Sequence, residues 1–512
     1  MDQKALFPLA KRVPSRVRNQ IAGPLRTYEA ASVSRRTVGW YPPQTSPNRN
    51  LIESLPLLRN RSRLAVRNDG YANGVIEKLV TNVVGTGIKP LSHATDPAFR
   101  RAAEGAFLNW TDEADADGLL DWYGVESLAT RCWFEAGEVF IRIRDRLPKD
   151  GLSVPMQVQV IEPELCPLWY NALLPGGNRV RAGIEFDAIG RRAAYYFFYY
   201  RPGDLVDWNP GDLRRVPAES VIHLYKPKRA GQLRGIPHLT QALIRLHELD
   251  KFDDATLTRQ QLAAMFVAFL THPTSDKSSV LPVEEISLPR SGGAPTLGLQ
   301  PGVFQELEIG EKVEFSDPPE PHGYVDFVRQ QLRAVSAATG VPYEILTGDM
   351  SQVNDRTVRV ILHEFRRSIQ ADQHHTVVYA LCRPVWRAWM DRAVLAGAVP
   401  VDAVAYATDP TPWLAAEWIP QGWPYIQPVQ DIQASEQAIR AGLTSRSAVV
   451  SEQGDSAEAI DAQQSEDNAR ADAAGLRYDS DGRFAPIPPP PLIPAQKAQG
   501  GETQADPGAG GY

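Results

Sequence analysis

The residues best suited to metal chemistry are histidines on predicted helices. His363 and Glu364 begin like the H-E-x-x-H motif, in which two histidines one helical turn apart bind zinc. Arg367 stands where the second histidine is required, so the two zinc ligands are not both present. His374 and His375 are adjacent, and their side chains diverge by about a third of a helical turn. The sequence therefore predicts no zinc site and favours solvated or interface histidines.

Two glycine pairs are the nearest approach to a phosphate-binding loop. Neither Gly85-Thr86-Gly87 nor Gly176-Gly177 has the lysine and the helix start of the G-x-x-x-x-G-K-[ST] motif. The first pair also lacks the third glycine of a dinucleotide-binding motif, because Pro90 takes that place. We expect turns at these glycines and no bound nucleotide or other cofactor.

Nucleophilic and acidic residues show no catalytic arrangement either. There is no G-x-S-x-G elbow, and Cys132 and Cys382 lie in apolar helical patterns that favour buried, inert thiols. Carboxylate pairs occur at Glu162/Glu164 and at Asp253/Asp254. Such pairs hold Mg²⁺ in some nucleases, but they occur more often as solvated charges. The sequence predicts a protein that is not an enzyme and that holds no metal.

The chain is long, and its two ends carry opposite charge. At 512 residues it exceeds the size that one hydrophobic core serves, so two or more structural regions are expected. Residues 1–67 carry about ten more basic than acidic side chains, and residues 400–512 about ten more acidic than basic. The net charge is −7. Because tight DNA binding requires clustered Lys and Arg, this acidic balance indicates that DNA, if present, slides past.

The cysteines and the apolar runs indicate the cellular compartment in which the protein is expected. The three cysteines lie far apart and form no disulfide framework, which favours a reducing compartment. The longest apolar runs, at 193–200 and 262–270, are about half of the roughly 20 residues that span a bilayer. We expect no membrane segment.

Hydrophobic periodicity predicts helices followed by a sheet in the first half of the chain. Residues 1–45 have no sustained period and are predicted to be either an arm that orders only against a neighbour or a disordered tail. Two amphipathic helices are predicted at 51–66 and 71–83, with a glycine turn into a strand after the second. Residues 97–137 are predicted helical, and 138–225 alternate with period two, which predicts a mostly antiparallel sheet. The expected core anchors of the helical stretch are Phe107, Trp110, Leu120, Trp122, Leu128 and Trp133.

The second half of the chain is predicted to contain long helices. One helix of about 34 residues, about 50 Å long, is expected between Pro237 and Pro273. Residues 273–320 are broken by proline and glycine, with a hairpin expected around Gly310.

Further helices are expected at about 325–339 and 355–396, with a bend near Pro384 in the second and a polar loop between them. After about residue 430 the chain is rich in Ala, Gln, Glu, Asp and Ser, which predicts disorder, at least beyond Gly475.

Four passages in a particular order carry a resemblance. They are Asn68-Asp69-Gly70-Tyr71 through Gly85-Thr86-Gly87-Ile88, Arg234-Gly235-Ile236-Pro237, Pro301-Gly302 through Gly310-Glu311-Lys312-Val313-Glu314-Phe315, and Gly340-Val341-Pro342-Tyr343 through Thr347-Gly348-Asp349. With them the chain resembles the phage portal family, in particular its lambda-like branch, over about residues 50–395.

The resemblance implies an α+β, portal-type subunit that assembles into a ring. Its expected parts are a basic N-terminal arm (1–49), an α+β wing (50–236), a long stem helix (237–272), a small β-containing clip (273–320), a second stem helix (321–340), a tunnel loop (341–356), wing and crown helices (357–430) and an acidic, Pro- and Gly-rich, largely disordered tail (431–512).

The function implied by the resemblance is that of a portal vertex protein of a tailed bacteriophage. A homo-oligomeric ring of about a dozen subunits is expected to form the channel for packaging and ejecting double-stranded DNA, which it contacts without sequence specificity. The clip is expected to dock the terminase large subunit and later the head completion and connector proteins, and the wing to meet the major capsid protein and scaffold. The protein is then expected in the virion, and in the host cytoplasm during assembly.

The same resemblance implies two sets of site residues. The tunnel-loop residues expected to face DNA are Thr347, Asp349, Ser351, Gln352, Asn354 and Arg356. The clip residues expected to contact docking proteins are Val303, Phe304, Glu306, Lys312 and Glu314. The arginines at the start of the next helix, Arg356, Arg359, Arg366 and Arg367, are expected to meet DNA or a neighbouring subunit, and intersubunit salt bridges are favoured.

Two other functions stay open at this point. A head–tail adaptor or minor capsid protein would share helical stalks, although the length of this chain argues against it. A packaging-associated, metal-dependent nuclease would need a carboxylate cluster that only folding brings together.

Overall fold

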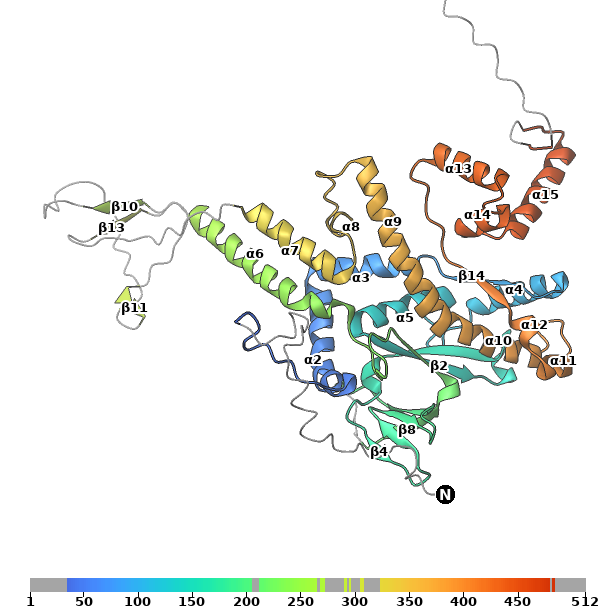
Figure 1. The fold of residues 1–512 in the computed structure, drawn as a ribbon, viewed down its shortest axis with the longest axis horizontal. Helices are drawn as coiled ribbons and strands as arrows, with labels where there is room; N and C mark the ends of the chain where they lie inside the picture. The colour runs from blue at the N-terminus through green and yellow to red at the C-terminus, as the bar shows by residue number, and fades with distance from the viewer. Residues whose placement is uncertain are drawn as a thin grey trace, which may run out of the picture.

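The computed structural model describes residues 35–204, 211–264, 323–478 and 481–483, together with four short strands between 268 and 307. Figure 1 shows a body of helices and small sheets, from which one pair of helices projects sideways. The predicted α+β class is confirmed. The first half contains helices α2 (Pro47–Asn68), α3 (Gly70–Val83), α4 (Pro97–Thr111) and α5 (Trp122–Ala136), and strands β1 (Lys89–Ser92), β2 (Glu138–Asp145), β3 (Met156–Ile161), β4 (Ala172–Leu173), β5 (Arg179–Arg181), β6 (Ile184–Phe186), β7 (Arg192–Phe198), β8 (Leu213–Pro217) and β9 (Val221–Tyr225).

The second half is mainly helical. Its helices are α6 (Leu243–Ala264), α7 (Tyr324–Thr339), α8 (Tyr343–Thr347), α9 (Asp355–Asp372), α10 (Arg383–Leu395), α11 (Ala403–Thr408), α12 (Thr411–Leu414), α13 (Pro428–Arg440), α14 (Arg446–Glu452) and α15 (Ala457–Ala474). Its strands are β10 (Ala268–Thr271), β11 (Arg290–Ser291), β12 (Ala294–Pro295), β13 (Phe304–Leu307) and β14 (Ala416–Ile419).

The two predicted N-terminal helices are confirmed as α2 and α3. Helix α2 begins four residues before the predicted start, because Ser46 caps it and Pro47 occupies its first turn. The Asp69 carboxylate accepts hydrogen bonds from the backbone N–H groups of Tyr71 (2.7 Å) and Ala72 (3.0 Å), which separates α2 from α3. After α3 the chain turns at Gly85 and enters β1 as predicted.

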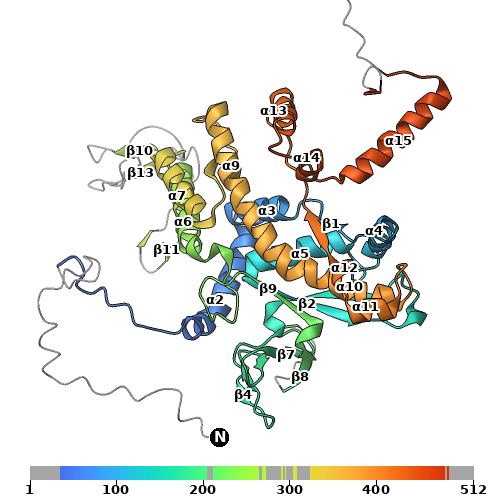
Figure 2. The same cartoon turned by 45° about the vertical axis from the view of Figure 1, so that its right-hand side comes forward.

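Two antiparallel sheets form in this region, as the sequence predicts, and the one that contains β4 and β8 lies at the edge of the body (Figures 1 and 2). The strand orders are β3-β2-β9 and β4-β5-β6-β7-β8. Alternate residues of β2 serve the two faces. Val139 and Ile141 pack into the helical core, whereas Phe140 faces the second sheet, with its ring centroid 5.2 Å from that of Phe197 and 5.5 Å from that of Tyr195.

Four of the six predicted core anchors are buried, namely Phe107, Trp110, Trp122 and Trp133. The prediction was wrong for Leu120 and Leu128, whose exposed fractions are 38% and 37%. Leu120 precedes the Asp121 cap and so lies outside the helix, and Leu128 lies on the face of α5 opposite its buried residues.

The predicted single helix between Pro237 and Pro273 is wrong at both ends. The segment begins with a 3₁₀ turn at His238–Gln241, and α6 ends at Ala264. Strand β10 follows and pairs in parallel with β13. A residue before proline avoids the helical region, and Phe269 and Thr271 favour strands, so the local sequence near Pro273 supports β10 rather than helix.

Helix α7 lies beside α6, and both point away from the body (Figure 1). It matches the predicted helix at 325–339 and ends at Gly340, whose φ of +76° terminates it. The predicted hairpin around Gly310 stays a prediction, because its second arm at 312–315 lies outside the described residues.

The long segment predicted at 355–396 is confirmed. It consists of α9, a π-helical stretch at Gln373–Cys382, and α10. The π-helical stretch directly precedes Pro384, which has no N–H to donate and so accommodates a wider turn.

The prediction of a largely disordered tail was wrong up to residue 475. Helices α13, α14 and α15 occupy most of 428–474 and contact the body at few points (Figures 1 and 2). The sequence argument weighed only the scarcity of apolar residues, whereas Ala, Gln and Glu have high intrinsic helix propensity. Residues 484–512, and residues 1–34 of the predicted arm, lie outside the described part of the chain.

Candidate channel surface

The predicted tunnel loop lies in the connection between α7 and α9. Helix α7 ends at Gly340, the short α8 follows, and residues 348–354 lead into α9 (Figures 1 and 2). Of the residues in this loop, Met350, Ser351, Gln352 and Asn354 are exposed, and Asp349 is half-buried.

Asp349 holds the loop in one conformation. Its carboxylate accepts hydrogen bonds from the Ser351 hydroxyl (2.6 Å), the Ser351 backbone N–H (3.1 Å) and the Tyr343 hydroxyl (2.9 Å). The Arg329 guanidinium of α7 lies 3.6 Å from the same carboxylate. These contacts, with the Ser351 hydroxyl foremost, lower the pKa of Asp349 to about 2, so the carboxylate is charged at neutral pH.

Two other predicted site residues shape the ends of the loop. The Thr347 hydroxyl donates to the Tyr343 carbonyl (2.8 Å) and accepts from the Asp349 N–H (3.2 Å). Asn354 caps α9 by accepting from the backbone N–H (2.9 Å) and the hydroxyl (3.0 Å) of Thr357. Both side chains therefore form hydrogen bonds that stabilise the ends of the loop.

The remaining predicted loop residues present their side chains to solvent. Ser351, Gln352 and Arg356 are exposed at the end of the loop and the first turn of α9. Sequence reasoning missed Tyr343 and Arg329, which hold Asp349. The Asp349-x-Ser351 spacing is a turn-forming pattern and was the one available signal for this arrangement.

Three of the four α9 arginines named above have partners inside this chain. Arg359 lies 3.4 Å from the carboxylate of Asp355, Arg366 stacks 4.8 Å from the ring centroid of Trp423, and Arg367 lies 3.8 Å from the carboxylate of Glu364. The expected contacts with DNA or a neighbouring subunit are not tested by a single chain and stay predictions.

The predicted clip residues are only partly described. Phe304 and Glu306 lie on β13, opposite Ala268 and Leu270 of β10. Val303, Lys312 and Glu314 lie outside the described residues.

The two projecting helices expose apolar side chains. On α6, Ile244 is 73% exposed and Leu257 is 55% exposed; on α7, Val325 is 64% exposed and Phe327 is 45% exposed. The inner face of the pair is held by Phe252, whose ring centroid lies 4.8 Å from that of Phe327. An isolated subunit thus leaves apolar surface on its projecting helices that an assembly would cover.

A buried ion cluster joins the sheets to the start of α6. The Glu138 carboxylate on β2 lies 2.6 Å from Arg234, contacts Arg59 of α2, and accepts from His223 (2.9 Å) and the Gly235 N–H (2.7 Å). All four side chains are at most 3% exposed. Burial alone would raise the pKa of Glu138, but Arg234 and Arg59 outweigh burial and hold that pKa well below its usual range.

Arg234 satisfies further backbone groups around the cluster. Its guanidinium donates to the carbonyls of Pro163, Cys166 and Ala182 at 2.9–3.2 Å. Burial lowers the pKa of His223 to about 4, so the imidazole is neutral and donates its Nε2–H to Glu138.

Two backbone segments approach each other closely beside this cluster, and the approach requires a glycine at position 235. A Cβ at Gly235 would lie 1.9 Å from the carbonyl oxygen of Gly137, and a Cβ at Gly137 would lie 2.4 Å from the backbone of Ile236. The Arg234-Gly235-Ile236-Pro237 passage is therefore a junction between the sheets and the projecting helix.

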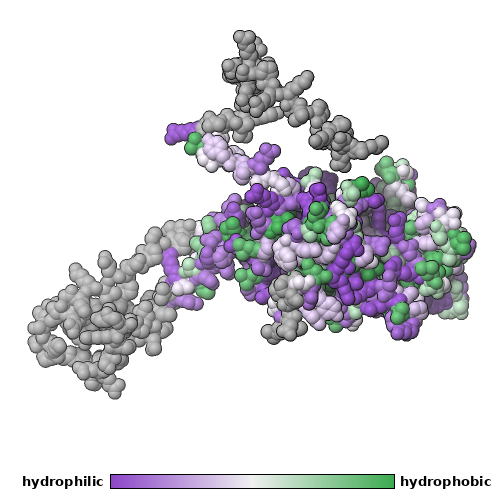
Figure 3. Space-filling view, turned by 90° about the horizontal axis from the view of Figure 1, so that it is seen from below, coloured by the Kyte–Doolittle hydropathy of each residue, from purple (hydrophilic) through white to green (hydrophobic). Residues whose placement is uncertain are grey.

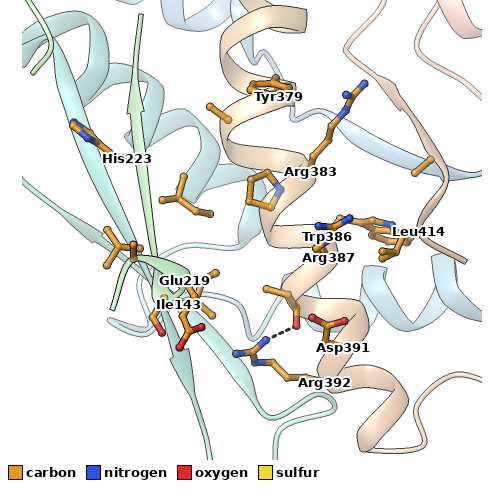
Figure 4. A pocket seen from close by; sticks show the side chains of 18 of the residues that line it. Ile143, Glu219, His223, Tyr379, Arg383, Trp386, Arg387, Asp391, Arg392 and Leu414 are labelled. Carbon is orange, nitrogen blue, oxygen red and sulfur yellow. Dashed lines mark hydrogen bonds between the residues drawn. The ribbon is translucent and has the colours of Figure 1, made fainter. Parts of the chain in front are cut away.

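A groove of about 1000 Å³ separates the edge strand β9 from the π-helical stretch and α10 (Figure 4). Charges of both signs line it, including Glu219, Arg387 and Asp391. Arg392 of α10 reaches across to Asp145 at 2.6 Å. Asp391 of α10 accepts a hydrogen bond from the Tyr406 hydroxyl at 2.7 Å, so two of the charged groups at this groove have partners within the chain.

Of the two cysteines predicted to be buried, Cys382 is buried, whereas Cys132 is only half-buried, so the prediction was wrong for Cys132. Glu162 and Glu164 lie 3.3 and 3.0 Å from Arg63. Within the described ranges, no group of three or more His, Cys, Asp or Glu side chains is placed to hold a metal ion. Over the same part of the chain, no helix has the length and apolar character needed to cross a bilayer.

Comparison with known proteins identifies the family. The model of the family described as "Phage portal protein, lambda family" matches residues 33–373. The "Probable portal protein" of Halomonas phage phiHAP-1 is 25% identical over 474 residues, which cover 88% of each chain. "Portal protein B" of Escherichia phage lambda is 23% identical over 493 residues, covering 86% of this chain and 88% of the relative.

Solved structures of similar shape come from gene transfer agent particles. One is the neck of a native particle computed with C12 symmetry, with a TM-score of 0.38, 13% identity, and coverage of 75% of this chain and 91% of the other. Another is the virion of a native particle, with a TM-score of 0.41 and 13% identity, covering 76% of this chain and 91% of the other. The family match spans most of the chain, and the protein belongs to the lambda family of phage portal proteins.

Proposed function

We propose that this chain is the portal protein of a tailed bacteriophage, and that copies of it form the ring through which double-stranded DNA is packaged and ejected. The observation that carries the proposal is the family match over residues 33–373, which includes the projecting helices, the loop and all of α9. A match of that extent favours a portal protein over the head–tail adaptor or minor capsid protein that the sequence left open.

The proposed parts follow the observed elements. Residues 50–236 are assigned to the wing, the segments at 237–272 and 321–340 with α6 and α7 to the stem, residues 273–320 to the clip, and residues 341–356 to the tunnel loop. Helices α9 to α12 then belong to the wing and crown. The exposed apolar residues of α6 and α7 support a stem that packs against neighbouring copies.

The partners and location are part of the same proposal. The clip docks the terminase large subunit and later the head completion and connector proteins, and the wing meets the major capsid protein and scaffold. The protein resides at the portal vertex of the virion after assembly in the host cytoplasm.

Portal proteins of this family are structural components, and we propose that this one has no enzymatic activity. A nuclease would need clustered carboxylates, and Glu162 and Glu164 are instead paired with Arg63. Incubation of the purified protein with plasmid DNA and Mg²⁺ or Mn²⁺ should leave the DNA intact. Cleavage that is abolished by a chelator would instead establish the nuclease.

Ring formation is the direct test of the proposed function. Size exclusion with light scattering and negative-stain microscopy should show a ring of about a dozen subunits with an axial channel. We expect Ile244→Asp combined with Val325→Asp to give monomers, because a carboxylate placed in an apolar contact is left without a partner.

The control for this experiment is Ile189→Asp, at a turn where the side chain is also 73% exposed, and it should form rings normally. A wild-type protein that stays monomeric at every concentration and salt would contradict the proposed function. Rings from the Ile244→Asp/Val325→Asp variant would contradict only the assignment of the stem surface.

The loop at 348–354 is proposed to contact passing DNA in a fixed conformation. Asp349→Ala removes the acceptor for Ser351 and Tyr343, so we expect limited proteolysis within the loop to be about tenfold faster, because opening no longer breaks those hydrogen bonds. Gln352→Ala, in the same loop and exposed, should be cleaved at the wild-type rate. In phage complementation, a loop deletion that packaged and retained DNA normally would exclude the proposed role.

A further inference from the structure

One face of the β3-β2-β9 sheet is covered over only part of its length. Phe140 of β2 contacts Phe197 of the second sheet, as described above. Arg142 and Arg144 follow on the same face of β2, because alternate residues of a strand share a face. Both arginines are half-buried, so the part of the face beyond Phe140 presents guanidinium groups where the first part presents apolar rings.

Four arginines gather there, and we call them the arginine face. They are Arg142 and Arg144 of β2, Arg146 just after β2, and Arg214 of β8. Arg214 stacks on Tyr199, with its guanidinium carbon 5.5 Å from the ring centroid, and Tyr199 is 62% exposed. The Nε of Arg142 is buried and has no hydrogen-bond partner among the described residues.

Neutral acceptors orient two of these arginines. The Arg144 Nε–H donates to the Gln159 side-chain oxygen (2.9 Å), and the Arg146 Nε–H donates to that of Gln157 (2.7 Å). The amide nitrogen of Gln157 is itself engaged, because it donates to the carbonyls of Glu113 (2.8 Å) and Asp115 (3.0 Å). The glutamine oxygens are therefore fixed toward the arginines, which they position without neutralising them.

Among the residues that the structure describes, few acidic groups compensate the charge of the arginine face. Among the described acidic groups, Asp117 lies near Arg144 and accepts from Gln159 at 3.1 Å. Burial, followed by the like charges of Arg144 and Arg214, lowers the pKa of Arg142. A protein of net charge −7 thus holds four cations near one another, three on or just after β2 and Arg214 on β8 of the second sheet, an arrangement that an anionic partner would stabilise.

We propose that the arginine face binds an acidic surface of a partner protein, whose carboxylates engage the free guanidinium N–H groups. Arginine and tyrosine are enriched in protein interfaces, and guanidinium–carboxylate pairs form strong bidentate hydrogen bonds. Strand β8, which carries Arg214, lies on the side of the body away from the start of α9 (Figures 1 and 2), and the surface seen from below is a mixture of hydrophilic and apolar areas (Figure 3). Because the loop at 348–354 is the proposed contact with DNA, we assign the opposite side to a protein partner. The inference deepens the proposed function, in which the wing meets other virion proteins, by assigning the chemistry of that contact.

The test uses the full chain and a labelled oligo-glutamate peptide as the probe. Fluorescence anisotropy should show salt-sensitive binding, and Arg142→Gln combined with Arg144→Gln should weaken it about tenfold. The matched control is Arg179→Gln combined with Arg181→Gln on β5, where both arginines are exposed and the same charge is removed. This control should bind within about twofold of the wild type.

A short DNA duplex of equal charge distinguishes the alternative ligand. Equal weakening of peptide binding in both double variants would overturn the proposal, since charge alone would then explain it. Loss of duplex binding with unchanged peptide binding in the Arg142→Gln/Arg144→Gln variant would also overturn it, in favour of a nucleic-acid surface. If that variant does not fold, Arg214→Gln on the exposed end of the face should give the same peptide result.

Light scattering on the same samples separates this proposal from the proposed function. Rings with no peptide binding would contradict the arginine face alone. Peptide binding by a protein that never forms rings would contradict the portal function and leave the arginine face in place.

Discussion

Glu138→Gln is expected to lower the free energy of unfolding by about 3–5 kcal/mol, the range typical when one partner of a buried charge cluster is removed. The substitution leaves Arg59 and Arg234 buried without a counter-charge. It also turns an amide NH₂ toward donors, because the two carboxylate oxygens accept from Arg59, Arg234, His223 and the Gly235 N–H. Urea denaturation followed by tryptophan fluorescence measures the loss.

The control is Glu77→Gln, which breaks the pair with Arg131 on a partly exposed surface, where the side chains are 49% and 31% exposed. Its cost should stay below about 1 kcal/mol. Adding Arg59→Met to Glu138→Gln should restore part of the loss, because one of the two stranded cations is removed. A Glu138→Gln protein as stable as the Glu77→Gln protein would show that the cluster does not hold the junction together.

Local sequence patterns predicted the helices well where the hydrophobic period was strong and where capping residues or glycines marked the helix ends. Helix α3 has its Asp69 cap and glycine turn, and α7 has its Gly340 stop, so both were placed within a residue or two. The end of α6 was missed because it depends on β10 pairing with β13, more than thirty residues further along the chain. The sequence of residues 237–272 gives no sign of this pairing, because the partner strand lies outside that segment.

The candidate site was predictable as a segment but not as a set of contacts. The resemblance located the loop, whereas its fixed conformation depends on Arg329 of α7 meeting Asp349. The buried cluster could not be predicted for the same reason, because Glu138 lies 79 residues from Arg59 and 96 residues from Arg234 in the sequence. One sequence shows the charges, and only the fold shows which of them are buried together.

Stability is expected to depend on pH through a second buried carboxyl, Glu126 of α5. It is fully buried, accepts the backbone N–H of Ile88 at 2.9 Å, and lies 3.3 Å from the Cys382 thiol. Burial, outweighing the Ile88 hydrogen bond, raises the pKa of Glu126 to about 8. The folded state therefore keeps a proton on Glu126 that the unfolded chain releases at about pH 4.3. That pH is the ordinary pKa of a glutamate to within about half a unit.

Because the folded pKa is raised, the contribution of Glu126 is fully present below about pH 4 and is lost as pH rises toward 8, at about 1.4 kcal/mol per pH unit. Glu126→Gln carries no such proton, and its amide oxygen can still accept from Ile88. Urea unfolding of the two proteins should therefore give a stability difference that shifts in favour of the variant by several kcal/mol between pH 5 and pH 8. Glu436→Gln, on the exposed surface of α13, should follow the wild-type curve throughout. A constant difference between wild type and Glu126→Gln over this range would mean that Glu126 is already ionised in the folded protein, with a compensating charge beside it.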